Sequence, residues 1–256
     1  MNAIEKKLST ALILTRPAHQ NKQLIEALNE SSISPIDYPF IEIEALDDYE
    51  LFDSIIHQLD AYHYLIFIST NAVKFFADRM NQLSLNLPQK IILASIGQTT
   101  RDALQHTFKR EVSCPDEIFD SEHLLAHPIF NNIESKNVLI VRGEGGRETL
   151  KSGLEKKGSA VAYAECYKRN FLPFDLKKLK EVTKGFKSIA FLITSNESAD
   201  HLISKIKNED KDWLQYCCLI VNHEKLEKKL GLIFKKKFVS PHINALTIIN
   251  IIEQLG

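Results

Sequence analysis

Short apolar runs alternate along the chain with longer stretches whose apolar residues recur at helical spacing. The runs, with the polar residues that end them, lie at 11–16, 65–71, 91–97, 138–142, 190–196 and 217–222. Patterns with a helical period follow them, for example at 21–28, 72–80, 148–158 and 197–206. Runs this short and rich in Ile, Leu and Val are typical of parallel strands covered by helices. The pattern therefore predicts an α/β protein with parallel sheets.

The two halves of the chain repeat this order. ALILTR at 11–16 corresponds to VLIVR at 138–142, and LIFISTN at 65–71 corresponds to AFLITSN at 190–196. IILASIG at 91–97 corresponds to CCLIVN at 217–222, and each half closes with an apolar helical stretch after a Cys-Pro or Ser-Pro pair. A long internal repeat reflects two copies of one structural plan. Each half is therefore predicted to fold as β-α-β-α-β-α-β-α.

Polar residues gather where the predicted strands end. Parallel strands present their carboxyl ends at one edge of a sheet, and ligands bind in the crevice outside that edge. Ser, Thr and Asn at these places are also good helix N-caps, which is the simpler role for any one of them. The ligand-binding candidates at these strand ends are Arg16, Ser69, Thr70, Asn71, Gly97, Thr99, Ser195 and Asn196.

The stretch VRGEGGRETL at 141–150 is the most distinctive strand end. A strand, a glycine-rich turn and a helix together form an anion site, because the first N–H groups of a helix and its dipole favour negative charge. Guanidinium forks add contacts suited to carboxylate or phosphate. The alternative is that the glycines only form the turn and the arginines face solvent. The candidates here are Arg142, Gly143, Gly145, Gly146 and Arg147.

A nicotinamide dinucleotide is an alternative ligand for this loop. Gly143 and Gly145 begin a G-x-G-x-x-G pattern, and the acidic Glu165 follows about 20 residues later, as in dinucleotide-binding folds. However, Glu148 replaces the third glycine, and the equivalent loop of the first half, RPAHQN, has no glycine. An NAD(P)-dependent oxidoreductase therefore stays as a second hypothesis, and a non-catalytic anion-binding protein as a third.

Composition narrows the functional classes further. A formal net charge of −1 excludes a strong overall attraction to nucleic acid. The four cysteines lack CxxC spacing, so buried thiols in a reducing cytoplasm are expected. No apolar stretch is long enough for a transmembrane helix, and no membrane partner is expected. His123 and His127 have the spacing of a metal pair on a helix but no third ligand nearby, so no metal is expected.

Tyr167 lies in an extended segment, AECYKRN. A tyrosine in such a place can pack its ring and direct its hydroxyl toward a ligand. Packing alone is the competing interpretation.

Taken together, these motifs resemble the uroporphyrinogen-III synthase family. The resemblance rests on TRP at 15–17, FISTNAV at 67–73, SIGQTT at 95–100, SEHLL at 121–125, VLIVRGEGGRETL at 138–150, and the pair Tyr167 and Arg169. It implies two similar parallel-sheet α/β domains joined by a two-stranded antiparallel ladder at about 39–44 and 165–170. Residues 1–38 with 168–256 would form one discontinuous domain, and residues 39–167 the other, with a hinge and a substrate cleft between them.

The resemblance also implies a reaction. Members of the family cyclise hydroxymethylbilane, a linear tetrapyrrole, to uroporphyrinogen III with inversion of ring D and loss of water, in heme biosynthesis. It implies no cofactor, a monomeric cytoplasmic lyase, and hydroxymethylbilane synthase as a candidate partner. A tyrosine on the ladder is the family's candidate acid, and Tyr167 matches it. The second half has Asn222 and His223 where many members have a Gly-Pro-Thr turn, so no catalytic threonine is carried over.

Overall fold

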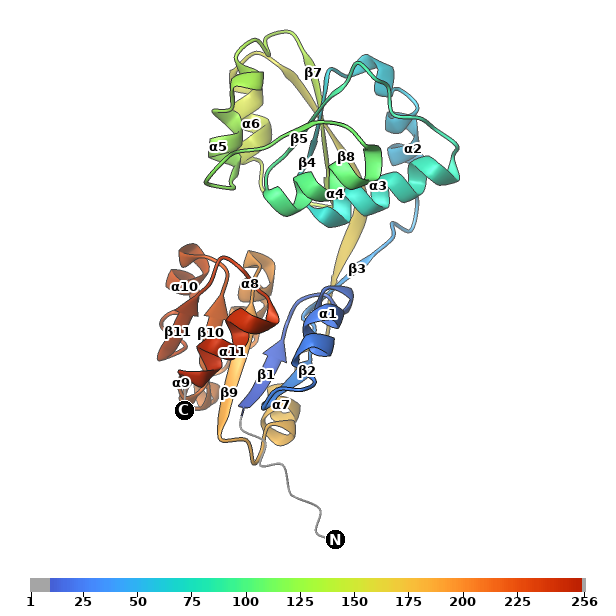
Figure 1. The fold of residues 1–256 in the computed structure, drawn as a ribbon. Coiled ribbons are helices and arrows are strands. Elements are labelled where there is room, and N and C mark those ends of the chain that lie inside the picture. Colours follow the sequence, from blue (N-terminus) through green and yellow to red (C-terminus); the bar gives the residue numbers. More distant parts are fainter. Residues whose placement is uncertain (1–9, 255–256) are drawn as a thin grey trace. The chain divides into compact units, whose positions relative to one another are not determined.

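A computed structural model describes residues 10–254 of the chain (Figure 1). The chain divides into two compact units. Unit 1 comprises the residues up to Glu42 and those from Asn170 onward, and unit 2 runs from Ile43 to Arg169. The chain crosses between the units within two strands, β3 (Ile41–Glu44) and β8 (Ala160–Phe171), which are hydrogen-bonded neighbours.

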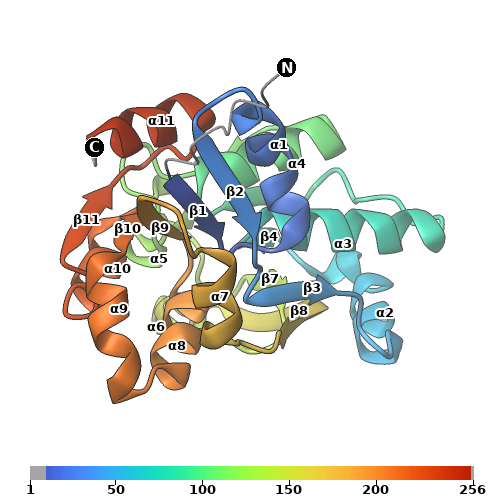
Figure 2. The same ribbon diagram turned by 90° about the horizontal axis from the view of Figure 1, so that it is seen from below.

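Unit 1 contains a five-stranded sheet in the order β11-β10-β9-β1-β2, and every pair in it is parallel. Its strands are β1 (Thr10–Leu14), β2 (Ile33–Asp37), β9 (Ser188–Ile193), β10 (Cys218–Val221) and β11 (Lys236–Val239). Figure 2 shows α1 (Ala18–Leu28) and α11 (Ala245–Glu253) on one face of this sheet and α7 (Leu176–Val182) and α8 (Asn196–Lys205) on the other. The remaining helices of the unit are η3 (Asn208–Asp210), α9 (Lys211–Tyr216) and α10 (Glu224–Leu230).

Unit 2 contains a six-stranded sheet in the order β3-β8-β7-β4-β5-β6. The strands not yet named are β4 (Tyr64–Phe67), β5 (Ile92–Ser95), β6 (Val112–Ser113) and β7 (Asn137–Gly143), and the pairs from β8 to β6 are parallel. The helices are α2 (Glu50–Ile56), η1 (Leu59–Ala61), α3 (Thr70–Gln82), α4 (Gln98–Phe108), α5 (Ser121–Leu125), η2 (Pro128–Phe130) and α6 (Thr149–Lys156).

Both faces of the unit 2 sheet are buried, which explains why its strands read as continuous apolar runs. Along β4, Leu65 and Phe67 join a cluster with Phe76 of α3, whereas Ile66 joins a second cluster with Leu154 of α6. Alternate residues of one strand therefore enter different cores, as the two-residue period of a strand requires.

The strand order confirms the predicted α/β class and the repeat, with one exchange between the halves. Strand β1, from the first half, pairs with β9 of the second half, whereas β7, from the second half, pairs with β4 of the first. Strand β8 is longer than the ladder segment predicted at about 165–170. Strand β8 begins at Ala160, because its first residues pair in parallel with β7 before the strand reaches the crossing.

Candidate active site

The predicted site residues of unit 2 follow three adjacent parallel strands. Ser69, Thr70 and Asn71 follow β4, Gly97 and Thr99 follow β5, and the glycine-rich loop follows β7. Because β5, β4 and β7 are neighbours in that order, their carboxyl ends lie at one edge of the sheet. Each of these turns leads directly into a helix, and the Ser69 hydroxyl caps α3 by accepting the Ala72 N–H at 3.1 Å. The fold thus gathers this half of the candidate residues.

Tyr167 belongs to the same edge of unit 2, and its side chain is buried. Only 1% of it is exposed, and its ring stacks on Phe75 with 5.5 Å between centroids. Its hydroxyl lies 3.1 Å from the Ser69 hydroxyl. The hydroxyl also accepts a hydrogen bond from Nη2 of Arg169 at 3.0 Å, while Nη1 of Arg169 donates to the Glu144 carbonyl at 3.0 Å. Tyr167 is therefore held from three sides.

Gly143 makes the room that the Tyr167 ring needs. A Cβ at Gly143 would lie 2.4 Å from Cε2 of Tyr167, a distance that real Cβ atoms do not show. The pairing of β7 with β8 is irregular at this point, because Arg142 faces Glu165 while Gly143 faces Tyr167. Irregular pairing of this kind re-aims side chains beside functional sites. The first glycine of the loop thus serves the tyrosine ring.

Arg142 does not lie on the surface as a strand-end arginine would, since only 2% of it is exposed. Its guanidinium lies over the Tyr163 ring at 4.4 Å and donates through Nη1 to the Arg147 carbonyl at 3.4 Å. Within the described chain its Nη2 has no partner. Gly146, at a φ of 106°, lies so close that a Cβ there would stand 2.4 Å from Nη2. Arg142 therefore lies beneath the loop and supports it through contacts with Arg147 and Gly146.

Two carboxylates lie near Arg142, Glu148 from the loop and Glu165 from β8. Glu148 lies 3.5 Å from Nη1 of Arg142, and Glu165 accepts the Gly145 N–H at 3.0 Å. Burial is the main cause, and a hydrogen bond to Glu148 the second, of the rise in the pKa of Tyr163 to about 12. A dinucleotide-binding fold needs the acidic residue for ribose and the loop amides for pyrophosphate. Here Glu165 binds one of those amides itself, which argues against the dinucleotide hypothesis.

The candidates of unit 1 lie at the carboxyl ends of β1 and β9, which are also neighbours. Arg16 donates from Nε to Oδ1 of Asn21 at 3.1 Å, and burial lowers the pKa of its guanidinium. Asn21, which the sequence pattern did not single out, is fully buried and also donates to Asp37 at 2.7 Å. Ser195 is the N-cap of α8, and Asn196 is the first residue of that helix.

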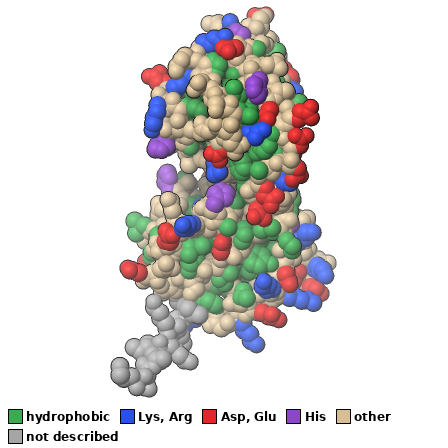
Figure 3. Space-filling model, turned by 90° about the vertical axis from the view of Figure 1, so that its right-hand side faces the viewer, with side chains coloured by type: hydrophobic (Ala, Val, Ile, Leu, Met, Phe, Trp, Pro, Cys, Tyr) green, Lys and Arg blue, Asp and Glu red, His purple; other side chains and the backbone are tan. Residues whose placement is uncertain are grey.

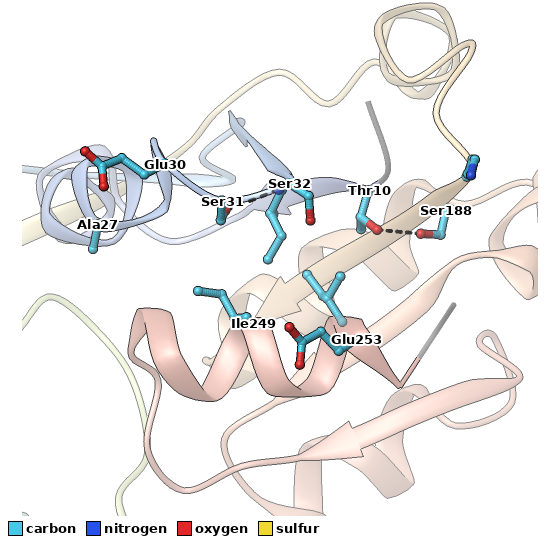
Figure 4. Close-up of a pocket in the computed structure, with 11 residues that line it drawn as sticks. Thr10, Ala27, Glu30, Ser31, Ser32, Ser188, Ile249 and Glu253 are labelled. Atoms are coloured by element: carbon cyan, nitrogen blue, oxygen red, sulfur yellow. Dashed lines mark hydrogen bonds between the residues drawn. The ribbon is translucent and has the colours of Figure 1, made fainter. Parts of the chain in front are cut away.

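A cavity of about 770 Å³ lies elsewhere in unit 1 (Figure 4). Its wall includes Thr10 and Ser188, the first residues of β1 and β9, whose hydroxyls are 2.6 Å apart. The cavity therefore opens at the amino ends of the strands, opposite to the edge from which the candidate loops emerge. It does not contain the predicted site.

The remaining candidate features of the sequence lie outside this site. In residues 10–254 no group of His, Cys, Asp and Glu is arranged to hold a metal, and His123 instead contacts the Asp120 carboxylate at 2.6 Å. None of the helices in that range is long and apolar enough to cross a membrane. All four cysteines are buried and free, as predicted. The face drawn in Figure 3 shows acidic and basic side chains interspersed.

The sequence of this chain is similar to known synthases over most of its length. The family model described as uroporphyrinogen-III synthase HemD matches residues 22–247. The uroporphyrinogen-III synthase of Proteus mirabilis is 32% identical over 164 residues, which cover 64% of this chain and 82% of the relative. That of Escherichia coli (strain K12) is 28% identical over 219 residues, covering 85% and 89%.

Solved structures show the same fold. A mutant uroporphyrinogen III synthase of the extremely thermophilic bacterium Thermus thermophilus superposes with a TM-score of 0.69 at 13% identity, covering 97% of this chain and 100% of that one. The Helicobacter pylori 26695 synthetase gives a TM-score of 0.55 at 17% identity, covering 96% and 97%. At these low identities the two structural matches show the fold alone. The matches in sequence show membership of the family. The chain belongs to the uroporphyrinogen-III synthase family.

Proposed function

We propose that this protein cyclises hydroxymethylbilane to uroporphyrinogen III, with inversion of ring D and loss of water. Two observations support the proposal: the family match over residues 22–247, and the buried Tyr167 hydroxyl, 3.1 Å from the Ser69 hydroxyl at a sheet edge of polar loops. The substrate is a reactive linear tetrapyrrole that also closes unaided to the uninverted isomer I. The protein's task is then to hold the chain so that ring D attacks through its substituted carbon.

The proposed carboxylate contacts are the polar strand ends of each unit. Helix N-termini and backbone amides bind anions without a metal or a nucleotide. In unit 2 the exposed positions Gly145, Gly146 and Arg147 suit a carboxylate that approaches the start of α6. The other proposed contacts are Arg16, Ser69, Thr70, Asn71, Gly97, Thr99, Arg142, Gly143, Ser195 and Asn196.

Tyr167 is proposed as the acid that assists departure of the substrate's hydroxyl group. General acid assistance is worth about 10² to 10⁴-fold in rate. The Arg169 guanidinium, which donates to the Tyr167 oxygen, favours negative charge left on that oxygen after proton transfer. We further propose that the protein works without a cofactor, as a monomer in the cytoplasm, receiving its labile substrate from hydroxymethylbilane synthase.

The isomer composition of the product tests the function. Hydroxymethylbilane is generated freshly, the protein is added, and the uroporphyrinogen isomers are oxidised and separated by chromatography. Isomer III is expected in excess over the enzyme-free control. Isomer I alone, from a folded protein, would refute the proposal.

A variant tests the acid role. Tyr167→Phe is expected to lose about 10²-fold in the rate of isomer III formation. Its circular dichroism should match that of the wild type, because the ring still fills the space beside Gly143. An unchanged rate in this variant would reject Tyr167 as the acid while leaving the overall reaction in place.

A further inference from the structure

The hydroxyl of Tyr167 has no open side from which it can reach a substrate. The side chain is 1% exposed, Phe75 covers one face of the ring, and Gly143 lies against its edge. Ser69, the neighbour of the hydroxyl, is only half-buried. It stands at the carboxyl end of β4, on the edge where the polar loops gather. The group nearest to solvent in this pair is therefore the serine.

The hydrogen bonds around Tyr167 have a direction. A guanidinium can only donate, so the Tyr167 oxygen accepts from Arg169. The tyrosine hydrogen then has one available neighbour, the Ser69 oxygen at 3.1 Å. The opposite arrangement would leave the tyrosine hydrogen buried without an acceptor, which costs about 1 to 3 kcal/mol. Tyr167 therefore donates to Ser69.

The direction continues at Ser69. A backbone N–H can only donate, so the serine oxygen also accepts from Ala72 at 3.1 Å. With both of its accepting positions used, the serine has only its own hydrogen to offer. Among the described residues, no acceptor is recorded for that hydrogen. The chain Arg169 to Tyr167 to Ser69 thus ends in an O–H on the half-buried side.

We infer that Ser69 is the catalytic residue that hands the proton to the substrate, with Tyr167 supplying it from behind. This inference rests on the proposed cyclisation and concerns how its first step is carried out. It assigns Arg169 a positioning role, because its donated hydrogen bond sets the direction of the whole chain. A capping serine thereby gains a chemical role that its position in the sequence does not reveal.

The proposed proton relay runs from Tyr167 through Ser69 to the substrate, and it conserves atoms and charge. Ser69 gives its proton to the hydroxyl of the substrate's terminal hydroxymethyl group, the C–O bond breaks, and water leaves with the bonding electron pair. The lone pair of the adjacent pyrrole nitrogen stabilises the carbon left behind. In the same movement the Ser69 oxygen takes the Tyr167 proton, and the phenolate keeps the hydrogen bond from Arg169. Ring closure later releases a proton from the substrate, which restores Tyr167 by the reverse route.

Three substitutions at Ser69 separate the hydroxyl from the helix cap. Ser69→Thr keeps both the cap and the hydroxyl, Ser69→Asn keeps the cap and loses the hydroxyl, and Ser69→Ala loses both. Single-turnover rates of isomer III formation are measured with each variant. We expect Thr to retain a rate within about 3-fold of wild type, and Asn and Ala both to lose about 10²-fold, the same loss as in Tyr167→Phe.

A double variant and a cap control complete the test. If one proton passes through both residues, Ser69→Asn combined with Tyr167→Phe loses no more than either change alone. Asn244 caps α11 of unit 1 by accepting the Thr247 N–H at 2.9 Å, and Asn244→Ala should lose that cap without changing the rate.

Two results would overturn the relay. One is a wild-type rate in Ser69→Asn when Tyr167→Phe is slow, which would mean that Tyr167 acts directly. The other is a double variant that loses the product of the two single losses. In both cases the wild-type protein still makes isomer III, so failure of the relay is distinguished from failure of the proposed reaction.

Discussion

Gly143 and Tyr167 occupy one space that no larger residue at position 143 can share. The missing Cβ would lie 2.4 Å from Cε2 and 2.6 Å from Cζ of the buried ring. The glycine is itself buried at the end of β7. The ring is also stacked on Phe75, so it cannot move toward solvent without breaking that stacking.

We therefore expect Gly143→Ala to displace the Tyr167 ring. Overpacking of a buried site costs about 1 to 3 kcal/mol of unfolding free energy. The Tyr167 hydroxyl, the proposed source of the proton, would move with the ring and away from Ser69, so the rate of isomer III formation should fall as well. Denaturant unfolding and the isomer assay measure the two effects.

Gly97→Ser is the matched control for stability. A Cβ at Gly97 meets only the Phe119 Cβ, at an ordinary 3.8 Å, and serine is a good residue for this N-cap of α4. Its unfolding free energy should equal or exceed that of the wild type. A Gly143→Ala protein as stable as this control would contradict the steric argument.

Glu165 should control how well the Gly145 amide is protected. The carboxylate accepts that N–H at 3.0 Å, and within residues 10–254 the Gly145 N–H has no second acceptor. In Glu165→Ala we expect the Gly145 amide to exchange with solvent faster in hydrogen-exchange NMR, because its acceptor is lost. Glu155→Ala, which removes only an exposed α6 carboxylate paired with Lys151, should leave Gly145 exchange unchanged. Equal exchange rates in the two variants would show that Glu165 does not hold the loop.

The pair Asp53 and Arg79 should make unit 2 sensitive to acid. Arg79 donates from Nε to Oδ1 of Asp53 at 2.8 Å and from Nη2 to Oδ2, and its hydrogen bonding lowers the pKa of Asp53. A lowered carboxyl pKa gives stability that is present above the unfolded value, near 3.8, and is lost as pH falls through the folded value.

Asp53→Asn should therefore be less stable than wild type at pH 7, and the difference should shrink below pH 3.8. Urea unfolding at a series of pH values measures this. Asp60→Asn, which affects a long 3.4 Å surface contact with Lys90, is the control and should follow the wild-type curve. A difference between Asp53→Asn and wild type that is constant with pH would contradict the assignment.

The cysteines should resist modification in the folded protein. All four are buried, and burial raises the pKa of Cys166, Cys217 and Cys218, so little of the reactive thiolate is present at neutral pH. We expect slow alkylation of the native protein and four adducts after denaturation, counted by mass spectrometry. A Ser135→Cys variant supplies an exposed thiol as a positive control. Rapid native labelling of Cys166 would show that the unit 2 core opens readily.

Much of the fold is visible in the pattern of apolar residues. Strands such as β4 and β9 are continuous apolar runs because both of their faces are buried, and the polar turns that end them cap the next helices as predicted. The pattern of apolar residues does not predict strand β2. It is ISPID, an edge strand with a proline and only one buried residue, and such a strand carries no strong apolar signal.

The site is harder to predict than the fold, because its contacts depend on burial. The sequence indicates that Gly143 and Arg142 belong to an anion loop, but not that one faces the Tyr167 ring and the other is 2% exposed beneath the loop. Arg169 belongs to the family motif, but the motif alone assigns it no role. The sequence does contain a signal for the role of Arg169, because residues two apart on a strand face the same side. This spacing places Arg169 beside Tyr167.

The exchange of strands between the halves of the chain has a consequence for synthesis on the ribosome. Unit 2 is continuous from Ile43 to Arg169, so all of its strands are available before the second half of unit 1 has been made. Strand β1, fully buried in the finished sheet, has β2 beside it early but must wait for β9 to be translated. We expect the nascent N-terminal segment to expose an apolar strand edge throughout that interval, which is when chaperones would be needed most.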